Sequence, residues 1–70
     1  MSKHPIPDLS IPEIETLIDS WIFSQRDRAI LKRRIIDNIT FDELSAEFYL
    51  SPQRIKTIVY KSEEIIYRHV

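Results

Sequence analysis

The sequence predicts an all-α fold, a compact domain of four short helices. Apolar residues recur every three or four positions in four segments, and no window alternates apolar and polar residues with period two. Each segment follows a Ser or Thr in position to cap a helix, and the connections are short. Short connections between amphipathic helices favour a helical bundle. We expect this domain over residues 10–70, preceded by a flexible tail over residues 1–9.

The first helix is predicted to begin after Ser10. Ser10 and Glu13 have the spacing of a capping box, and a proline such as Pro12 is tolerated in the first turn. One apolar face follows at helical spacing, formed by Ile14, Leu17, Ile18, Trp21 and Ile22. We expect Trp21 to belong to the core.

The second helix is predicted to begin after Ser24 and to run to about Asp37. Asn38 is the expected stop, because asparagine tolerates the left-handed conformation where glycine is absent. The apolar positions of this segment are Ala29, Ile30 and Ile36, with Ile39 beyond its end.

A third, short helix is predicted after Thr40, which forms a second capping box with Glu43. Its apolar side carries Phe41, Leu44 and Phe48.

The fourth helix is predicted over residues 52–69. Ser51 is a good N-cap, and Pro52 fits the first helical position. Its buried face is expected to carry Ile55, Ile58, Ile65 and Ile66, with Ser62 in the middle.

Composition excludes several classes of function. The 70 residues include no Cys and no Gly. Disulfides, thiolate zinc sites, phosphate-binding glycine loops and glycine-based nucleophile elbows are therefore excluded. His4 and His69 are isolated, and no catalytic arrangement of side chains stands out, so we expect no metal, no cofactor and no enzyme activity. Without a signal peptide or a membrane-length apolar run, we expect a cytoplasmic protein with no membrane partner.

Charge is distributed in blocks although the net charge is only −1. Residues 25–34 carry five cations and one acid, and residues 51–61 carry three cations and no acid. Between them, residues 35–50 carry four acids and no cation. Two interpretations stay open: the basic blocks form one basic surface, or they are ordinary solvated helix faces.

Residues 40–61 match the apolar frame of a helix-turn-helix. Counted from Phe41, that frame requires two close-packed helices with apolar plugs and one small residue where the second helix crosses. The matching positions are Leu44, Ser45, Leu50, Ile55 and Ile58, with Ser45 as the small residue. The frame alone is equally compatible with any capped helical hairpin.

Three segments together resemble the fourth conserved region of bacterial sigma-70 family RNA polymerase sigma factors. They are the arginine-rich stretch 26–34, the sequence Thr-Phe-Asp-Glu-Leu-Ser at 40–45, and Ser-Pro-Gln-Arg-Ile-Lys-Thr-Ile at 51–58. The resemblance covers about residues 24–69. The chain also resembles small stand-alone sigma-region-like proteins of phages and mobile elements, which share a Trp-bearing helix in front.

This resemblance implies a DNA-binding transcription regulator or a sigma-like promoter-binding protein, with double-stranded DNA as partner. The recognition helix 52–69 would enter the major groove, where Gln53, Lys56 and Thr57 would read bases. The implied phosphate contacts are Thr40, Ser51, Arg54, Lys61, Arg26, Arg28, Lys32 and Arg33.

Two positions depart from the family pattern. Pro52 stands where the family often has a base-reading arginine, so the DNA preference is expected to differ or to be weak. Tyr49 occupies a turn position where Gly, Asp or Asn is usual, and a positive φ there would cost about 1 kcal/mol or more.

A second function class is a protein-interaction module that docks on RNA polymerase or another protein without reading DNA. Val59, Tyr60, Ile66 and Val70 predict an exposed apolar strip, hence a partner or homodimer surface. The lack of net positive charge and the Pro52 departure favour this class, whereas the +3 of residues 51–61 favours DNA binding.

Overall fold

A computed structural model describes residues 9–69, which form four helices and no strand. The helices are α1 (Ile11–Trp21), α2 (Gln25–Ile35), α3 (Phe41–Phe48) and α4 (Pro52–Tyr67). The predicted all-α class is thus confirmed. The predicted tail lies outside the described residues except for Leu9, which is half-buried and packs against the core.

All four predicted N-caps are present. In α1, Ser10 Oγ accepts from the Glu13 amide at 3.3 Å, and Glu13 Oε1 accepts from the Ser10 amide at 2.9 Å. The same reciprocal pair joins Thr40 and Glu43 in α3. Ser24 and Ser51 accept from the amides three residues later. Each cap satisfies an amide that the helix itself leaves without a partner.

The capping-box hydrogen bonds of Ser10 hold the pKa of Glu13 below its ordinary value. Its contribution to stability is therefore present at neutral pH and is lost as the pH falls through the lowered pKa.

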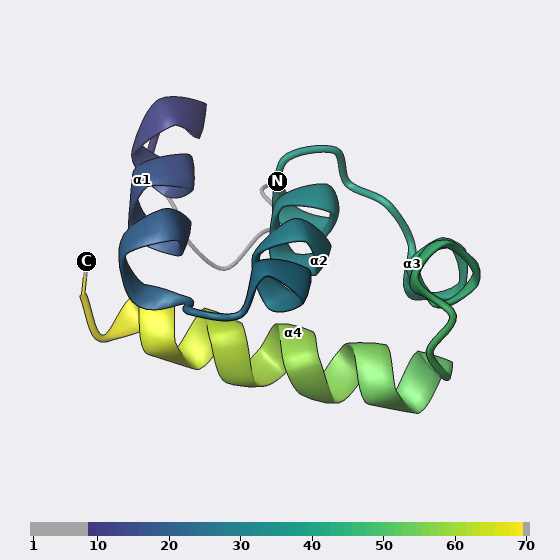
Figure 1. The fold of residues 1–70 in the computed structure, drawn as a ribbon. Coiled ribbons are helices and arrows are strands. Elements are labelled where there is room, and N and C mark those ends of the chain that lie inside the picture. Colours follow the sequence, from purple (N-terminus) through teal and green to yellow (C-terminus); the bar gives the residue numbers. More distant parts are fainter. Residues whose placement is uncertain (1–8, 70) are drawn as a thin grey trace.

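The long helix α4 crosses beneath the other three (Figure 1). The hairpin of α1 and α2 stands on one part of α4, and α3 lies at the end of α4 next to the turn that joins them. Helix α2 contacts all three others, whereas α1 and α3 share no contact between their described residues. The core therefore lies between α4 and the central helix α2.

Eleven apolar side chains are buried in that core. They are Ile14, Ile18, Ile22, Ile30, Leu31, Ile35, Leu44, Ile55, Ile58, Val59 and Ile66. Most were predicted from helical spacing, but Leu31, Ile35 and Val59 were not. The radius of gyration, 11.3 Å, is close to the value of about 11 Å expected for a compact chain of this length.

Ser45 and Leu50 close the turn between α3 and α4. The Ser45 hydroxyl donates to the Leu50 carbonyl, and the Leu50 amide donates to the Ser45 carbonyl at 3.2 Å. Both backbone groups of Leu50 are thereby satisfied by one small residue. Ser45 thus has two roles: its small size lets α4 cross closely, and its hydrogen bonds close the turn.

Asn38 and Tyr49 are the two described residues with positive φ, at 61° and 58°. Asn38 fits its predicted role as a helix stop, since asparagine adopts this conformation readily. Tyr49 ends α3 in the left-handed conformation, and its side chain is 92% exposed. Its ring therefore adds no core packing that would offset the backbone cost.

Tyr49→Asn is expected to raise the free energy of unfolding by about 1 kcal/mol, because asparagine tolerates a positive φ. In a chain of this size that gain corresponds to a rise in Tm of about 4–8 °C. Thermal denaturation followed by circular dichroism measures it. Tyr49→Ala is the control, since alanine keeps the Cβ and its cost. Equal melting temperatures for the two variants would contradict the account.

Candidate functional site

The three predicted base-reading residues are exposed on the first two turns of α4. Gln53, Lys56 and Thr57 face solvent, whereas Ile55 and Ile58 on the same turns are buried. The buried face anchors the helix, so the polar face is held in a fixed orientation. Lys56, the charged residue of the three, forms no ion pair within residues 9–69.

The cations of α4 divide between two flanks of the helix. At 3.6 residues per turn, Lys56 lies about 160° around the axis from Arg54 and about 140° from Lys61. Contacts agree with this geometry: Lys56 Nζ lies 5.8 Å from the centroid of the Phe41 ring, whereas Arg54 and Lys61 line a groove on the other flank. The structure therefore does not bring Lys56 together with the predicted phosphate partners.

The Lys56 flank carries an aromatic and cationic cluster that the sequence did not predict. The Arg34 guanidinium lies 4.3 Å from the Phe41 ring centroid, and Tyr60 meets that ring edge-on at 5.9 Å. Arg34 also donates to the Ile39 carbonyl at 2.9 Å. Arg34 therefore links the end of α2 to the start of α3, and Lys56 lies over the same Phe41 ring.

Most cations of α2 that were predicted to contact phosphates have partners inside the protein. Arg28 donates to the backbone carbonyls of Ile22 and Asp19, and Lys32 pairs with Asp19 at 2.9 Å. These contacts join α1 to α2. Because of these contacts, Arg28 and Lys32 are less available to bind a phosphate than the sequence resemblance implied.

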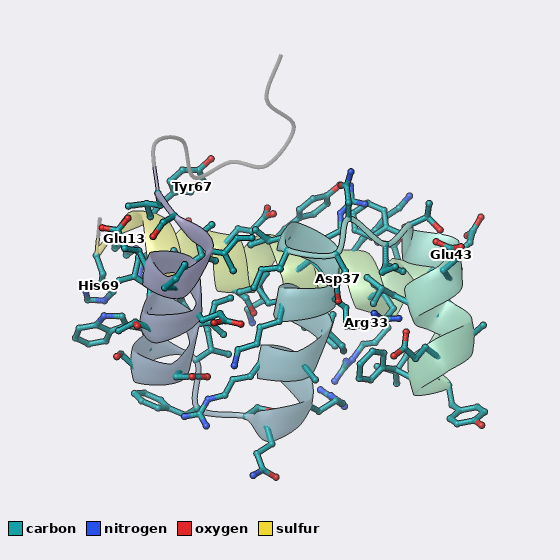
Figure 2. All side chains as sticks on the ribbon, turned by 90° about the horizontal axis from the view of Figure 1, so that it is seen from above. Glu13, Arg33, Asp37, Glu43, Tyr67 and His69 are labelled. Carbon is teal, nitrogen blue, oxygen red and sulfur yellow. The ribbon has the colours of Figure 1, made fainter. Side chains whose placement is uncertain are left out.

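Arg33 joins α2 to α3. It pairs with Asp37 and with Glu47, each at 3.0 Å (Figure 2 shows Arg33 beside Asp37). Hydrogen bonds to Glu47 and then Asp37 raise the pKa of Arg33. Arg33 is thus a link between helices, with two carboxylates beside it.

The two capping hydroxyls differ in their suitability for phosphate. Thr40 Oγ1 both accepts from the Glu43 amide and lies 3.1 Å from the Glu43 carboxylate, whose charge opposes an anion there. Ser51 Oγ accepts from the Arg54 amide at 3.1 Å and has no carboxylate bonded to it. Of the two, only Ser51 remains a suitable phosphate contact.

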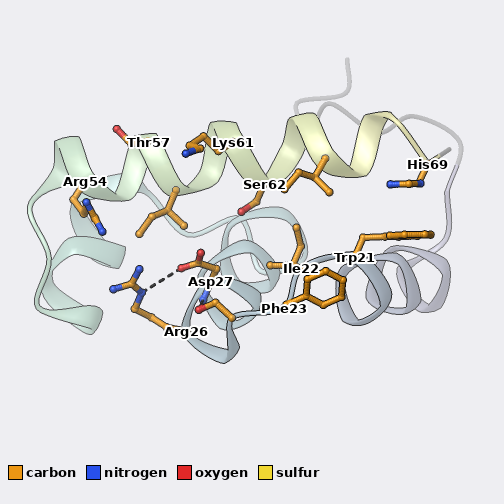
Figure 3. A pocket seen from close by; sticks show the side chains of 13 residues that line it. Trp21, Ile22, Phe23, Arg26, Asp27, Arg54, Thr57, Lys61, Ser62 and His69 are labelled. Atoms are coloured by element: carbon orange, nitrogen blue, oxygen red, sulfur yellow. Dashed lines mark hydrogen bonds and ion pairs between the residues drawn. The ribbon is translucent and has the colours of Figure 1, made fainter.

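A groove of about 500 Å³ runs along the other flank of α4 (Figure 3). Arg26, Arg54 and Lys61 contribute cations to it, and Arg26 is held by Asp27 at 3.2 Å. Trp21, Phe23 and His69 form its aromatic end. The groove is lined on one side by residues at the connection between α1 and α2, and on the other side by residues of α4.

The predicted apolar strip is wrong for two of its members. Val59 is 1% exposed and Ile66 is fully buried, whereas Tyr60 is exposed and Val70 lies outside the described residues. Val59 and Ile66 are seven residues apart and therefore share the helix face of Ile55, which points into the core. The buried stripe of α4 is wider than the isoleucine spacing indicated.

The prediction of a core position for Trp21 is also wrong. Trp21 is 39% exposed, and its ring stacks on His69 with centroids 3.6 Å apart. Ile14, Ile18 and Ile22 fill the interior on this side. Trp21 is the last residue of α1, so its ring covers the end of α4 instead of entering the core.

Partial burial raises the pKa of Glu63 above its ordinary value, and attraction by Arg34 lowers it in part. The folded chain thus binds a proton at Glu63 more tightly than the unfolded chain does. Ionised Glu63 therefore destabilises the fold at neutral pH. This loss begins to shrink as the pH falls to the raised pKa, and it is gone below the ordinary pKa of glutamate.

Glu63→Gln is expected to raise Tm at pH 7, because glutamine carries no charge to bury. The gain should vanish below the ordinary glutamate pKa of about 4.3, where Glu63 is protonated in both the folded and the unfolded chain. Melting curves across this range measure the difference. Glu64→Gln, at an exposed neighbour, is the control. A gain that stays constant with pH would contradict the burial effect.

Among residues 9–69, no group of three or more His, Asp or Glu side chains is placed to hold a metal ion. Within the same range, every helix is too short or too polar to span a membrane. Comparison with known protein families, curated proteins and solved structures finds no match for this chain.

Proposed function

We propose that the protein binds double-stranded DNA and regulates transcription, with the first turns of α4 in the major groove. The observation that carries the proposal is the exposed set Gln53, Lys56 and Thr57, on a helix whose opposite face is buried. A short turn, Tyr49 to Ser51, joins α4 to α3. This arrangement supports the sigma-like promoter-binding activity that the sequence resemblance implies.

The three side chains offer different contacts to base edges. Glutamine pairs with the edge of adenine, and lysine donates to the acceptors of guanine. The Thr57 hydroxyl donates to the Gln53 carbonyl at 3.0 Å, so its methyl group is the part left to contact thymine. Together these residues suit a short site of mixed composition.

Of the predicted phosphate contacts, Ser51, Arg54 and Lys61 are the most suitable. Arg54 and Lys61 form no ion pair with any described residue. The other predicted contacts are less suitable because each has a carboxylate or carbonyl partner inside the protein; they are Arg26, Arg28, Lys32, Arg33 and Thr40. Docking on RNA polymerase without DNA reading, and homodimer formation, stay predictions of the sequence.

Selection from a pool of random duplex DNA, followed by sequencing of the bound fraction, tests the proposal. We expect a short enriched motif and an affinity that falls steeply with salt, because phosphate contacts release counterions. The selection is run at two salt concentrations, with the protein as a folded chain verified by circular dichroism. Absence of binding at the lower salt concentration would reject DNA reading.

A further inference from the structure

The groove on the Arg54 flank of α4 has a cationic end and an apolar end (Figure 3). Arg54 and Arg26 lie at the cationic end, and Trp21, Phe23 and His69 at the other. Lys61 lies between them along α4. The groove lies on the opposite flank of α4 from Lys56, but Thr57, Arg54 and Lys61 line it, so it overlaps one side of the proposed DNA contact.

The cationic end has unmatched positive charge. Arg26 is paired with Asp27 at 3.2 Å, but neither Arg54 nor Lys61 has a carboxylate within ion-pair distance in the described chain. Both side chains belong to α4, a helix anchored by its buried face. Two cations without partners on one anchored helix favour a ligand that brings carboxylates.

The other end exposes apolar surface that the fold does not use. Phe23 is 79% exposed in the short connection between α1 and α2, next to the half-exposed Trp21. Ile58 and Ile65 line the groove from α4, and Ile22 from the connection. An exposed phenylalanine and the half-buried Ile65 in the same groove favour an apolar side chain as partner.

We propose that this groove binds an acidic, amphipathic peptide segment of a partner protein. Its carboxylates pair with Arg54 and Lys61, and its apolar side chains cover Phe23 and the half-buried Ile65. A nucleic acid strand fits less well, since its phosphates would leave the exposed Phe23 uncovered and the Trp21 ring is already stacked on His69. The proposal does not require the protein to bind DNA.

The only tryptophan of the chain, Trp21, lines the groove and reports binding by its fluorescence. The probe is a synthetic helical peptide of about 18 residues with Glu on one face and Leu and Phe on the other. Two comparison peptides replace Glu by Lys, or Leu and Phe by Ser. We expect the Trp21 fluorescence to change and to saturate with the first peptide. The affinity should be about tenfold lower for each of the two comparison peptides.

Matched variants locate the contact. Phe23→Ser is expected to weaken peptide binding about fivefold. Tyr60 is an exposed aromatic residue on the other flank, so Tyr60→Ser should leave peptide binding unchanged. Arg54→Gln with Lys61→Gln is expected to weaken binding and reduce its salt dependence, whereas Lys56→Gln does neither. All five positions are exposed, and circular dichroism verifies that each variant is folded.

Three results would overturn the proposal. One is equal affinity for the Glu and Lys peptides. Another is binding unaffected by Phe23→Ser. A third is a change in Trp21 fluorescence that depends on protein concentration alone, together with a dimer in sedimentation. In that case a second copy of the chain would cover the groove. Because no DNA is present in these measurements, their failure leaves the DNA proposal intact, and the reverse also holds.

Discussion

Leu44→Ala is expected to lower the free energy of unfolding by about 2–5 kcal/mol. Leu44 is fully buried between α3 and the rest of the core, and it is the one side chain of α3 that is fully buried. Its removal leaves a cavity that a short helix held by one turn fills poorly. The loss combines the transfer free energy of the deleted atoms with the cost of that cavity.

Such a loss is large for this chain. A core in a domain below about 70–80 residues rarely supplies more than about 3–5 kcal/mol of net stability. Leu44→Ala is therefore expected to lose most of its stability, as measured by urea denaturation and circular dichroism. Leu17→Ala makes the same deletion at a half-buried position of α1 and should cost less. Similar losses at both sites would show that the described packing is incorrect.

Lys56→Ala is expected to weaken binding to the selected DNA site by about 1–3 kcal/mol, because one base contact is lost. That loss corresponds to about 5- to 150-fold in Kd. It is measured by titration of duplexes that carry the selected site and of duplexes in which single base pairs are changed. The preference at one base pair should relax together with the affinity.

Lys61→Ala is the matched comparison for Lys56→Ala. A lysine that contacts phosphate weakens binding to all sequences about equally and lowers the salt slope by about 1. Lys56 also lies near the Phe41 ring, so a melting curve must show that the Lys56 variant stays folded. Unchanged affinity and unchanged base preference in a folded Lys56→Ala protein would remove Lys56 from the site.

The N-caps and helix stops were predictable because their interactions are local. Ser10 bonds an amide three residues away, and Asn38 takes its left-handed conformation within a single residue. Neither depends on where the other helices pack. The same holds for Tyr49, whose positive φ follows from its place at the end of α3. Helical spacing likewise predicted the greater part of the core.

The candidate site was only partly predictable, because it depends on contacts between helices. Gln53, Lys56 and Thr57 are exposed as expected, since their helix positions oppose the isoleucines. The sequence did not indicate that Lys56 and Arg54 lie on opposite flanks of α4 beside different neighbours. A count of cations in a segment carries no information about the flank on which each lies.

By itself, the sequence determined the all-α class, the four helix starts and most of the buried isoleucines, because these follow from hydrogen bonds and periodicity within each segment. Only the tertiary structure decided which polar and aromatic groups remain available. Arg33 has Glu47 as a partner from fourteen residues away, Val59 is covered, and Phe23 is left exposed. Those outcomes depend on how helices distant in the chain pack, which no local pattern encodes.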